Sequence, residues 1–246
     1  MPNLSIRDSL RWRGLWIVCL LSIRELLRPL FYWYIWHIYE SDLVHQFPQP
    51  YSSSMLDIVI YTSQADLSSI KPRLVAMGEL SALEIETRFH RGDAIALASS
   101  SGQPVGYMWM AFSSGVELAF DTYWIIRTGE ALRYGAFVLP CFRGRGIYSA
   151  LNSALNKYAL ECGVTNTLGS VSVLNPQSLS LPKHYKRRAS MTVFVARTRL
   201  PYFTFRKSFR APLHSRFSWS RRFSQVTGQP LASDEFEESD NNSRVE

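Results

Sequence analysis

The middle of the chain alternates between short apolar runs with the composition of strands and longer stretches with the period of helices. The predicted strands cover residues 56–61, 93–98, 104–112, 131–139 and 167–174. The predicted helices cover residues 67–77, 80–89 and 147–162. A short turn at 99–102 joins two of the strands, which predicts an antiparallel hairpin. We therefore expect one domain of mixed strands and helices over residues 51–199.

The clearest helical period follows the strand at 131–139. Apolar residues recur there at steps of three and four, at Ile147, Ala150, Leu151, Ala154, Leu155, Tyr158, Ala159 and Cys162. Gly163 stands where a C-terminal glycine cap belongs. This helix and the strands before and after it predict a β-α-β unit, with a tight turn between its first two elements.

Residues 1–50 are basic and very aromatic, and we expect them to form an extension to the domain. An apolar arc at helical spacing runs through Trp12, Leu15, Trp16, Cys19, Leu20, Ile23, Leu26, Leu27 and Leu30. Arg24, Glu25 and Arg28 interrupt this stretch, and each would cost about 2.5–3.5 kcal/mol at the centre of a membrane, so a membrane span is not expected. The helix either packs on the domain's own sheet or lies in a membrane interface. The aromatic run at 31–39 fits an interface and a strand equally well.

The net charge of +7 is concentrated near the C-terminus. The stretch 183–222 holds 12 of the 27 basic residues and no acidic ones, so the rest of the chain is net acidic. No core periodicity is recognisable beyond Pro201, and the acidic stretch 234–240 is predicted to be disordered, so 200–246 reads as a tail. Aromatic residues interleaved with arginines over 201–222 fit an anionic membrane surface or single-stranded nucleic acid, and we favour the membrane.

The length of 246 residues allows one sizeable domain with extensions. Three widely spaced cysteines, Cys19, Cys141 and Cys162, form no C-x-x-C pair. This argues against a disulfide framework and a zinc site, and it is typical of a reducing compartment. We expect a cytoplasmic protein without a metal, which contacts the inner face of a membrane through residues 7–39 and 201–222.

The turn at 141–148, which reads Cys-Phe-Arg-Gly-Arg-Gly-Ile-Tyr, has the composition of an anion-binding site. Its glycines allow the backbone to come close to a ligand, and the helix that follows points N–H groups and its positive dipole end toward it. Arg143 and Arg145 add donors suited to phosphate oxygens. The glycine spacing fits neither a P-loop nor a dinucleotide fingerprint. The plainer alternative is a tight turn with two solvated arginines.

Residues 137–151 resemble the coenzyme A-binding motif of the GNAT acetyltransferases, in which R-x-x-G-x-G/A joins a strand to a helix. Arg143 matches the motif's Arg or Gln and Gly146 its central glycine, whereas Tyr148 replaces the usual Gly or Ala. A weaker resemblance extends from Leu56 to about Arg199. It implies an α+β GNAT fold, with a mixed and mostly antiparallel sheet flanked by helices, and it implies acetyl-CoA as acyl donor.

The resemblance also implies which residues bind the donor. Backbone amides of 143–148 would hold the pyrophosphate, and the strand edge at 137–139 would pair with the pantetheine arm. Asn175 matches the start of the family's N-x-x-S/A motif. The predicted binding residues are therefore Phe137, Val138, Leu139, Arg143, Gly144, Arg145, Gly146, Ile147, Tyr148 and Asn175.

Attack of an amine on a thioester requires a neutral amine and a proton for the leaving thiolate. The resemblance implies a tyrosine as the acid, and Tyr185 is the candidate, although its distance from Asn175 is three residues longer than usual. Glu130 is the candidate base or water-orienting carboxylate, with Glu117 and Asp121 as alternatives. Tyr185 could instead be a packed aromatic, and each carboxylate a solvated loop residue.

The predicted function is transfer of an acetyl group from acetyl-CoA to an amine, which could belong to a small molecule, an amino sugar or a protein. The alternative is a GNAT-shaped binding protein without catalytic activity, which acts at a membrane or on nucleic acid through its basic flanks.

Overall fold

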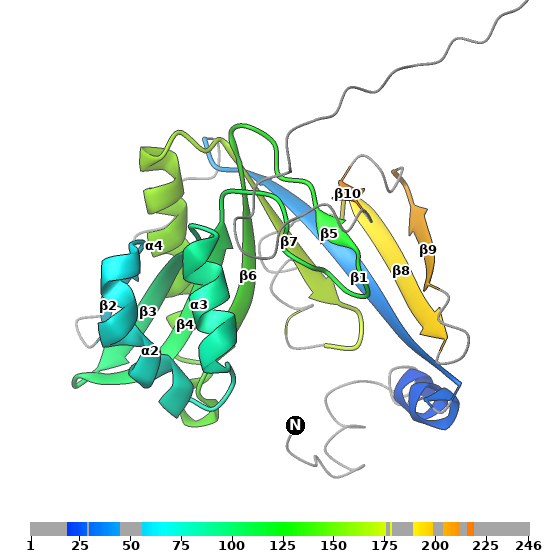
Figure 1. Ribbon diagram of the computed structural model, residues 1–246, viewed down its shortest axis with the longest axis horizontal. Helices are drawn as coiled ribbons and strands as arrows, with labels where there is room; N and C mark the ends of the chain where they lie inside the picture. The colour runs from blue at the N-terminus through cyan, green and yellow to red at the C-terminus, as the bar shows by residue number, and fades with distance from the viewer. Residues whose placement is uncertain are drawn as a thin grey trace, which may run out of the picture.

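The computed structural model of the chain describes residues 19–28, 30–44, 56–175, 178, 189–198, 204–211 and 216–218. They form one large sheet with helices on both faces and one small sheet (Figure 1). In sheet order, the large sheet contains β2 (Asp57–Tyr61), β3 (Ala94–Ser100), β4 (Gln103–Ala111), β6 (Glu130–Val138), β7 (Asn166–Ser172), β1 (Phe31–Asp42), β8 (Met191–Thr198) and β9 (Thr204–Phe209). The small sheet contains β5 (Tyr123–Trp124) and β10 (Phe217–Ser218). The helices are η1 (Gln64–Asp66), α2 (Leu67–Ala76), α3 (Ala82–His90), η2 (Pro140–Phe142) and α4 (Ile147–Glu161), together with a helical segment at 19–27.

Neighbouring strands of the large sheet pair antiparallel except β6 and β7, which are parallel. The predicted hairpin is the pair β3–β4, and the predicted β-α-β unit is β6–α4–β7. The α+β fold class, with a mixed and mostly antiparallel sheet flanked by helices, is thus confirmed.

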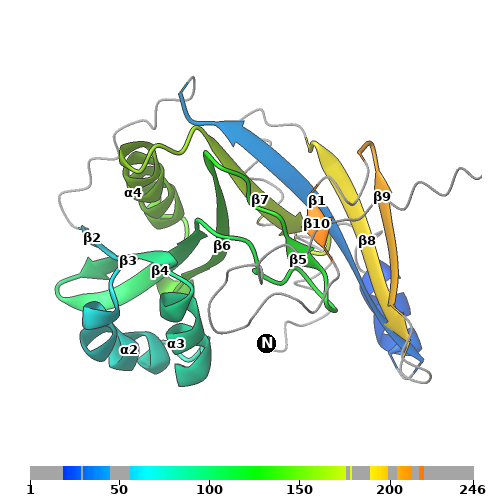
Figure 2. The same cartoon turned by 45° about the horizontal axis from the view of Figure 1, so that its top comes forward.

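Helices cover the two faces of the β2–β3–β4–β6 half of the sheet separately (Figure 2). Because side chains of a strand alternate between faces, Met108 packs in the cluster under α4 while Trp109 packs with α2 and α3. α3 begins with a capping box, in which Ser81 Oγ accepts from Glu84 N at 3.2 Å and the Glu84 carboxylate accepts from Ser81 N at 2.9 Å. Gly163, with φ +80°, follows the end of α4 as predicted.

The N-terminal segment contributes a central strand to the sheet. β1 pairs with β7 on one side and with β8 on the other, so the aromatic run at 31–39 is a strand. The sheet therefore extends beyond the predicted limits of the domain at 51 and 199, since β9 also belongs to it. In the helical segment at 19–27, Ile23 is 46% and Leu26 78% exposed, so the sheet does not cover this part of the apolar arc. Among the described residues, no helix has the length and apolar character to cross a membrane.

The C-terminal segment also enters the core, although no core periodicity is recognisable in the sequence beyond Pro201. Phe217 is 1% exposed and lies against Trp124, with ring centroids 4.7 Å apart. β10 is only two residues long. Such a short strand carries no period that a sequence pattern can reveal. The acidic stretch 234–240 lies outside the described residues.

Candidate functional site

The predicted anion-binding turn joins β6 to α4 through η2. Gly144 has φ +77° and Gly146, the residue that precedes α4, has φ +76°. This left-handed conformation costs residues with a Cβ about 1–2 kcal/mol, which explains why glycine stands at both positions. A Cβ built on Gly144 would meet no atom within 4 Å, which leaves open space on this side of the turn. With glycine at its N-cap, α4 begins without a side-chain hydrogen bond to its first turn.

The side chains of the turn leave this space open. Arg143 is exposed, and its Nε donates to the carbonyl of Val138 at 3.2 Å. The guanidinium of Arg145, also exposed, lies 5.1 Å from the ring centroid of Phe142. Tyr148, the departure from the family motif, is partly buried and packs against the core beneath α4. The turn therefore exposes backbone groups and two arginines.

β6 offers an open backbone edge next to this turn. It pairs with β7 only from Glu130 to Arg133, and the two strands then diverge (Figure 2). Among the described residues, its ladder partner over Tyr134–Val138 is β4 alone, with a register shift opposite Gly135, whose φ is +54°. At about 3.3 Å per residue, this edge is roughly 16 Å long. Its residues Gly135 and Ala136 are exposed, so the edge faces solvent between the two strands.

The structure separates the predicted donor-binding residues into three groups. Phe137, Val138 and Leu139 are half-buried at the end of β6, where the carbonyl of Val138 is taken by Arg143. Ile147 is 2% exposed, so only its backbone can face a ligand. Asn175 follows β7 and accepts a hydrogen bond at Oδ1 from Ser178 N at 3.2 Å. The part of the β6 edge that remains available to a ligand therefore lies closer to Gly135 than the predicted residues 137–139.

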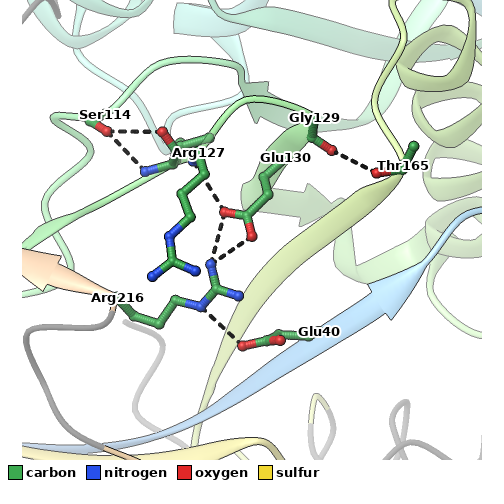
Figure 3. Close-up of polar contacts among 8 residues, drawn as sticks. Glu40, Ser114, Arg127, Gly129, Glu130, Thr165 and Arg216 are labelled. Atoms are coloured by element: carbon green, nitrogen blue, oxygen red, sulfur yellow. Dashed lines mark hydrogen bonds and ion pairs between the residues drawn. The ribbon is translucent and has the colours of Figure 1, made fainter.

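Glu130 lies at the opposite end of β6 from the turn, in an ion-pair network (Figure 3). Arg216 donates from Nη1 to both carboxylate oxygens of Glu130, at 2.7 and 2.8 Å, and from Nε to Glu40 at 3.1 Å. The side chains of Arg216 and Glu130 are only 12% and 10% exposed. Burial lowers the pKa of Arg216, whereas Glu130 and Glu40 raise it. The effect of the two carboxylates is the larger in sum, so the pKa of Arg216 lies above its ordinary value. In this structure Glu130 ties the C-terminal segment to the sheet.

The other candidates for acid–base chemistry are also engaged or lie elsewhere. Glu117 accepts a hydrogen bond from Asp121 N at 2.8 Å, and Asp121 forms an ion pair with Arg197. Tyr185 lies outside the described residues.

A buried polar cluster that the sequence reading missed lies beside the open edge of β6. Asp93 is fully buried and accepts hydrogen bonds from Arg91 Nε, at 3.0 and 3.1 Å, from Arg91 Nη2 and from Tyr134 Oη. Arg91 Nη2 also donates to Tyr134 Oη at 2.7 Å. Burial raises the pKa of Asp93, opposed by Arg91, and burial together with the Asp93 charge raises the pKa of Tyr134 well above its ordinary value. The sequence signal that could have revealed this cluster is Asp93 itself, an acidic residue directly before the buried strand β3.

In the described part of the chain, no group of three or more His, Cys, Asp or Glu side chains could hold a metal ion. The three cysteines are free and exposed.

Comparison with known proteins yields matches among solved structures only. No family model and no curated protein matches the chain. A functionally unknown conserved protein from Staphylococcus epidermidis matches at 14% identity and a TM-score of 0.46, over 78% of this chain and 65% of that protein. The chain thus spans less than two thirds of that protein's length.

Two further matches belong to the family that the sequence resembles. A tandem GNAT protein from the clavulanic acid biosynthesis pathway matches at 14% identity and a TM-score of 0.49, over 80% of this chain and 72% of that one. An aminoglycoside N-acetyltransferase in complex with coenzyme A matches at 18% identity and a TM-score of 0.41, over 55% of this chain and 89% of that one. At these identities the similarity concerns the path of the chain alone.

Proposed function

We propose that this protein binds acetyl-CoA at the turn 143–148 and transfers its acetyl group to an amine. The observation that carries the proposal is the open surface formed by Gly144, Gly146 and the first turn of α4, next to an unpaired edge of β6. Backbone N–H groups and a helix dipole favour a pyrophosphate at the turn. The open edge of β6 offers backbone groups that an amide-containing arm can pair with, on either side of the bulge at Gly135, whose φ is +54°.

The reaction proceeds by direct attack. The neutral amine nitrogen attacks the thioester carbonyl carbon, a C–N bond forms and the C–S bond breaks. The amine loses one proton and the leaving thiolate takes one up, so the products are an amide and the free thiol. A thioester lying along the open edge would reach the bulge at Gly135, where the strands diverge and an acceptor can approach.

Glu130 and Tyr185 are the proposed base and acid. Glu130 is paired with Arg216 and begins β6, roughly 16 Å along the strand from Gly135 at about 3.3 Å per residue, so it would act through a chain of ordered waters rather than by direct contact with the amine. A Glu130→Gln variant should then lower kcat, while the affinity for acetyl-CoA stays unchanged. A change in affinity alone would assign Glu130 a structural role.

Calorimetric titration with coenzyme A and acetyl-CoA tests the donor site directly. The variant Gly144→Glu places a carboxylate where the pyrophosphate would lie, and we expect it to abolish binding. Gly78→Glu is the matched control, because Gly78 has φ +79° and, like Gly144, nothing within 4 Å of a built Cβ. Both substitutions impose the same backbone strain of about 1–2 kcal/mol, and only one changes the turn.

Saturable binding that Gly144→Glu abolishes and Gly78→Glu preserves is the expected result. A folded wild-type protein that binds neither ligand would overturn the proposal. Equal loss in both variants would mean that strain, not the turn, controls binding.

The basic flanks support a second, non-catalytic role at an anionic membrane surface in the cytoplasm, favoured over nucleic acid. Phe205 and Phe209 on the edge strand β9 are 57% and 51% exposed, with Lys207 between them. Co-sedimentation with anionic vesicles at low salt, lost at high salt, is expected if this surface contacts lipid. Binding to single-stranded RNA but not to vesicles would favour the nucleic-acid alternative.

A further inference from the structure

A cationic side chain with an unpaired buried nitrogen lies behind the open edge of β6. Among the described residues, Nη1 of Arg88 is fully buried and has no hydrogen-bond partner, and the same is true of the indole Nε1 of Trp109. The Arg88 guanidinium lies 5.2 Å from the ring centroid of Trp109 and 5.0 Å from that of Tyr134. Buried donors are nearly always paired in native proteins, so two neighbouring unpaired donors need an explanation.

Both groups lie directly against the bulge. A Cβ built on Gly135 would lie 2.8 Å from Arg88 Nη1 and 3.3 Å from Trp109 Cδ1. Gly135 itself is exposed and belongs to the part of β6 that β7 leaves unpaired. Only a residue without a side chain fits between the guanidinium and the open edge. A ligand at that edge reaches Nη1 only if the Arg88 side chain rotates past Gly135.

The carboxylates nearest to Arg88 are already engaged. Asp93 accepts hydrogen bonds from Arg91 and from Tyr134. Glu84, one helical turn before Arg88, accepts from the backbone and hydroxyl of Ser81 at 2.9 and 2.8 Å. Among the described residues, Arg88 is thus a guanidinium at the bulge to which no carboxylate is hydrogen-bonded, although the charges of Asp93 and Glu84 act on it from a distance. A guanidinium presents a planar fork of donors that matches a carboxylate better than any other common anion of single charge.

We propose that Arg88, assisted by Trp109 Nε1, binds the carboxylate of the acyl acceptor, so that the acceptor is an amine of the amino-acid type. This inference rests on the proposed function and specifies its second substrate. The carboxylate lies at Arg88, which places the amino group of the same molecule beside the bulge at Gly135. There the amine nitrogen forms the C–N bond as the C–S bond of the donor breaks, and the product is an N-acylated acid plus the thiol.

Binding of paired probes to the protein saturated with coenzyme A tests the assignment. N-acetylglycine and N-methylacetamide differ only by a carboxylate, as do N-acetylphenylalanine and N-acetylphenethylamine. Saturation-transfer NMR gives the affinity for each member. We expect each acid to bind roughly ten- to a hundredfold tighter than its neutral partner, as one charge-assisted hydrogen-bond pair provides.

Three variants locate the effect. Arg88→Met should remove the preference for the acids and leave the affinity for the neutral probes unchanged, while Arg88→Lys should retain part of it because the charge stays. Arg73→Met is the control, an arginine of the neighbouring helix that hydrogen-bonds to Ser99 at 3.0 Å, and it should change nothing. Circular dichroism confirms that each variant is folded.

Calorimetry with coenzyme A on the same samples separates the two hypotheses. Coenzyme A binding with equal affinity for acids and neutral probes, or an equal effect of Arg88→Met on both, overturns the carboxylate site alone. Loss of coenzyme A binding in the wild-type protein overturns the donor site on which it rests.

Discussion

Replacing Arg216 by methionine tests whether its ion pair with Glu130 holds the C-terminal segment on the sheet. The two side chains are 12% and 10% exposed, and two hydrogen bonds of 2.7 and 2.8 Å join them. Removing one partner of a fully buried pair costs about 3–5 kcal/mol. Because some solvent reaches both groups and Arg127 N also donates to Glu130, we expect a loss of about 2–3 kcal/mol in the free energy of unfolding.

A double-mutant cycle with Arg216→Met and Glu130→Gln isolates the pair itself. Each single variant leaves one poorly solvated group without its partner, whereas the double variant leaves neither charge. The double variant should therefore be more stable than the sum of the single effects implies, with a coupling energy of about 1.5–3 kcal/mol. Urea unfolding, followed by circular dichroism and by tryptophan fluorescence, supplies the four free energies.

Lys71 and Glu86 provide the comparison for this cycle. Their atoms are 2.5 Å apart, but both side chains are 36% exposed, and such surface pairs contribute about 1 kcal/mol or less. A coupling energy at Arg216–Glu130 no larger than that of the Lys71–Glu86 cycle would refute the reasoning, since burial would then add nothing.

Three further predictions concern Asp93, Phe217 and His37. Asp93→Asn removes the carboxylate that pairs with buried Arg91 and should destabilise the fold by about 3 kcal/mol, measured by urea unfolding; a loss below 1 kcal/mol would contradict the buried pair. Phe217→Ala should cost about 3–4 kcal/mol because the ring fills the core beside Trp124, and an unchanged midpoint would show that β10 is not docked. Burial lowers the pKa of His37, so the stability it supports is complete above its unfolded pKa near 6.5 and declines as the pH falls below that value. Melting temperatures from pH 5 to 8 should show this decline in the wild-type protein, and His37→Gln should flatten it.

The longer elements between 56 and 174 could be predicted because their signals are local, whereas η1, β5 and η2 are too short to show a period. An alternating or helical period depends only on residues that are close in the sequence. The β6–α4 turn is recognisable from Gly144, Gly146 and the amphipathic helix that follows them. The same holds for the antiparallel hairpin β3–β4, where the turn chemistry lies between the two strands.

The place of β1 could not be predicted because its partners lie far along the chain. Trp36 pairs with Ser172 on one side and Val193 on the other, and no property of the run at 31–39 specifies either strand. The cluster at Asp93 is hidden in the same way. Arg91 is two residues away, but Tyr134 comes from another strand, and only the fold brings its hydroxyl to the carboxylate.

One strand organises everything proposed for this site. β6 diverges from β7 after Arg133, so its backbone has no ladder partner on that side among the described residues. Two residues further on stands Gly135, which has no side chain and a left-handed backbone. Both are costs to stability, since unpaired edges and left-handed residues weaken a sheet. They also create the two features that the proposed function uses, an edge for the donor's arm and a position without a side chain against which Arg88 lies. A Gly135→Ala variant should fill that position and displace the guanidinium. It should weaken binding of N-acetylglycine while coenzyme A still binds, and equal loss of both would mean that the bulge serves the donor alone.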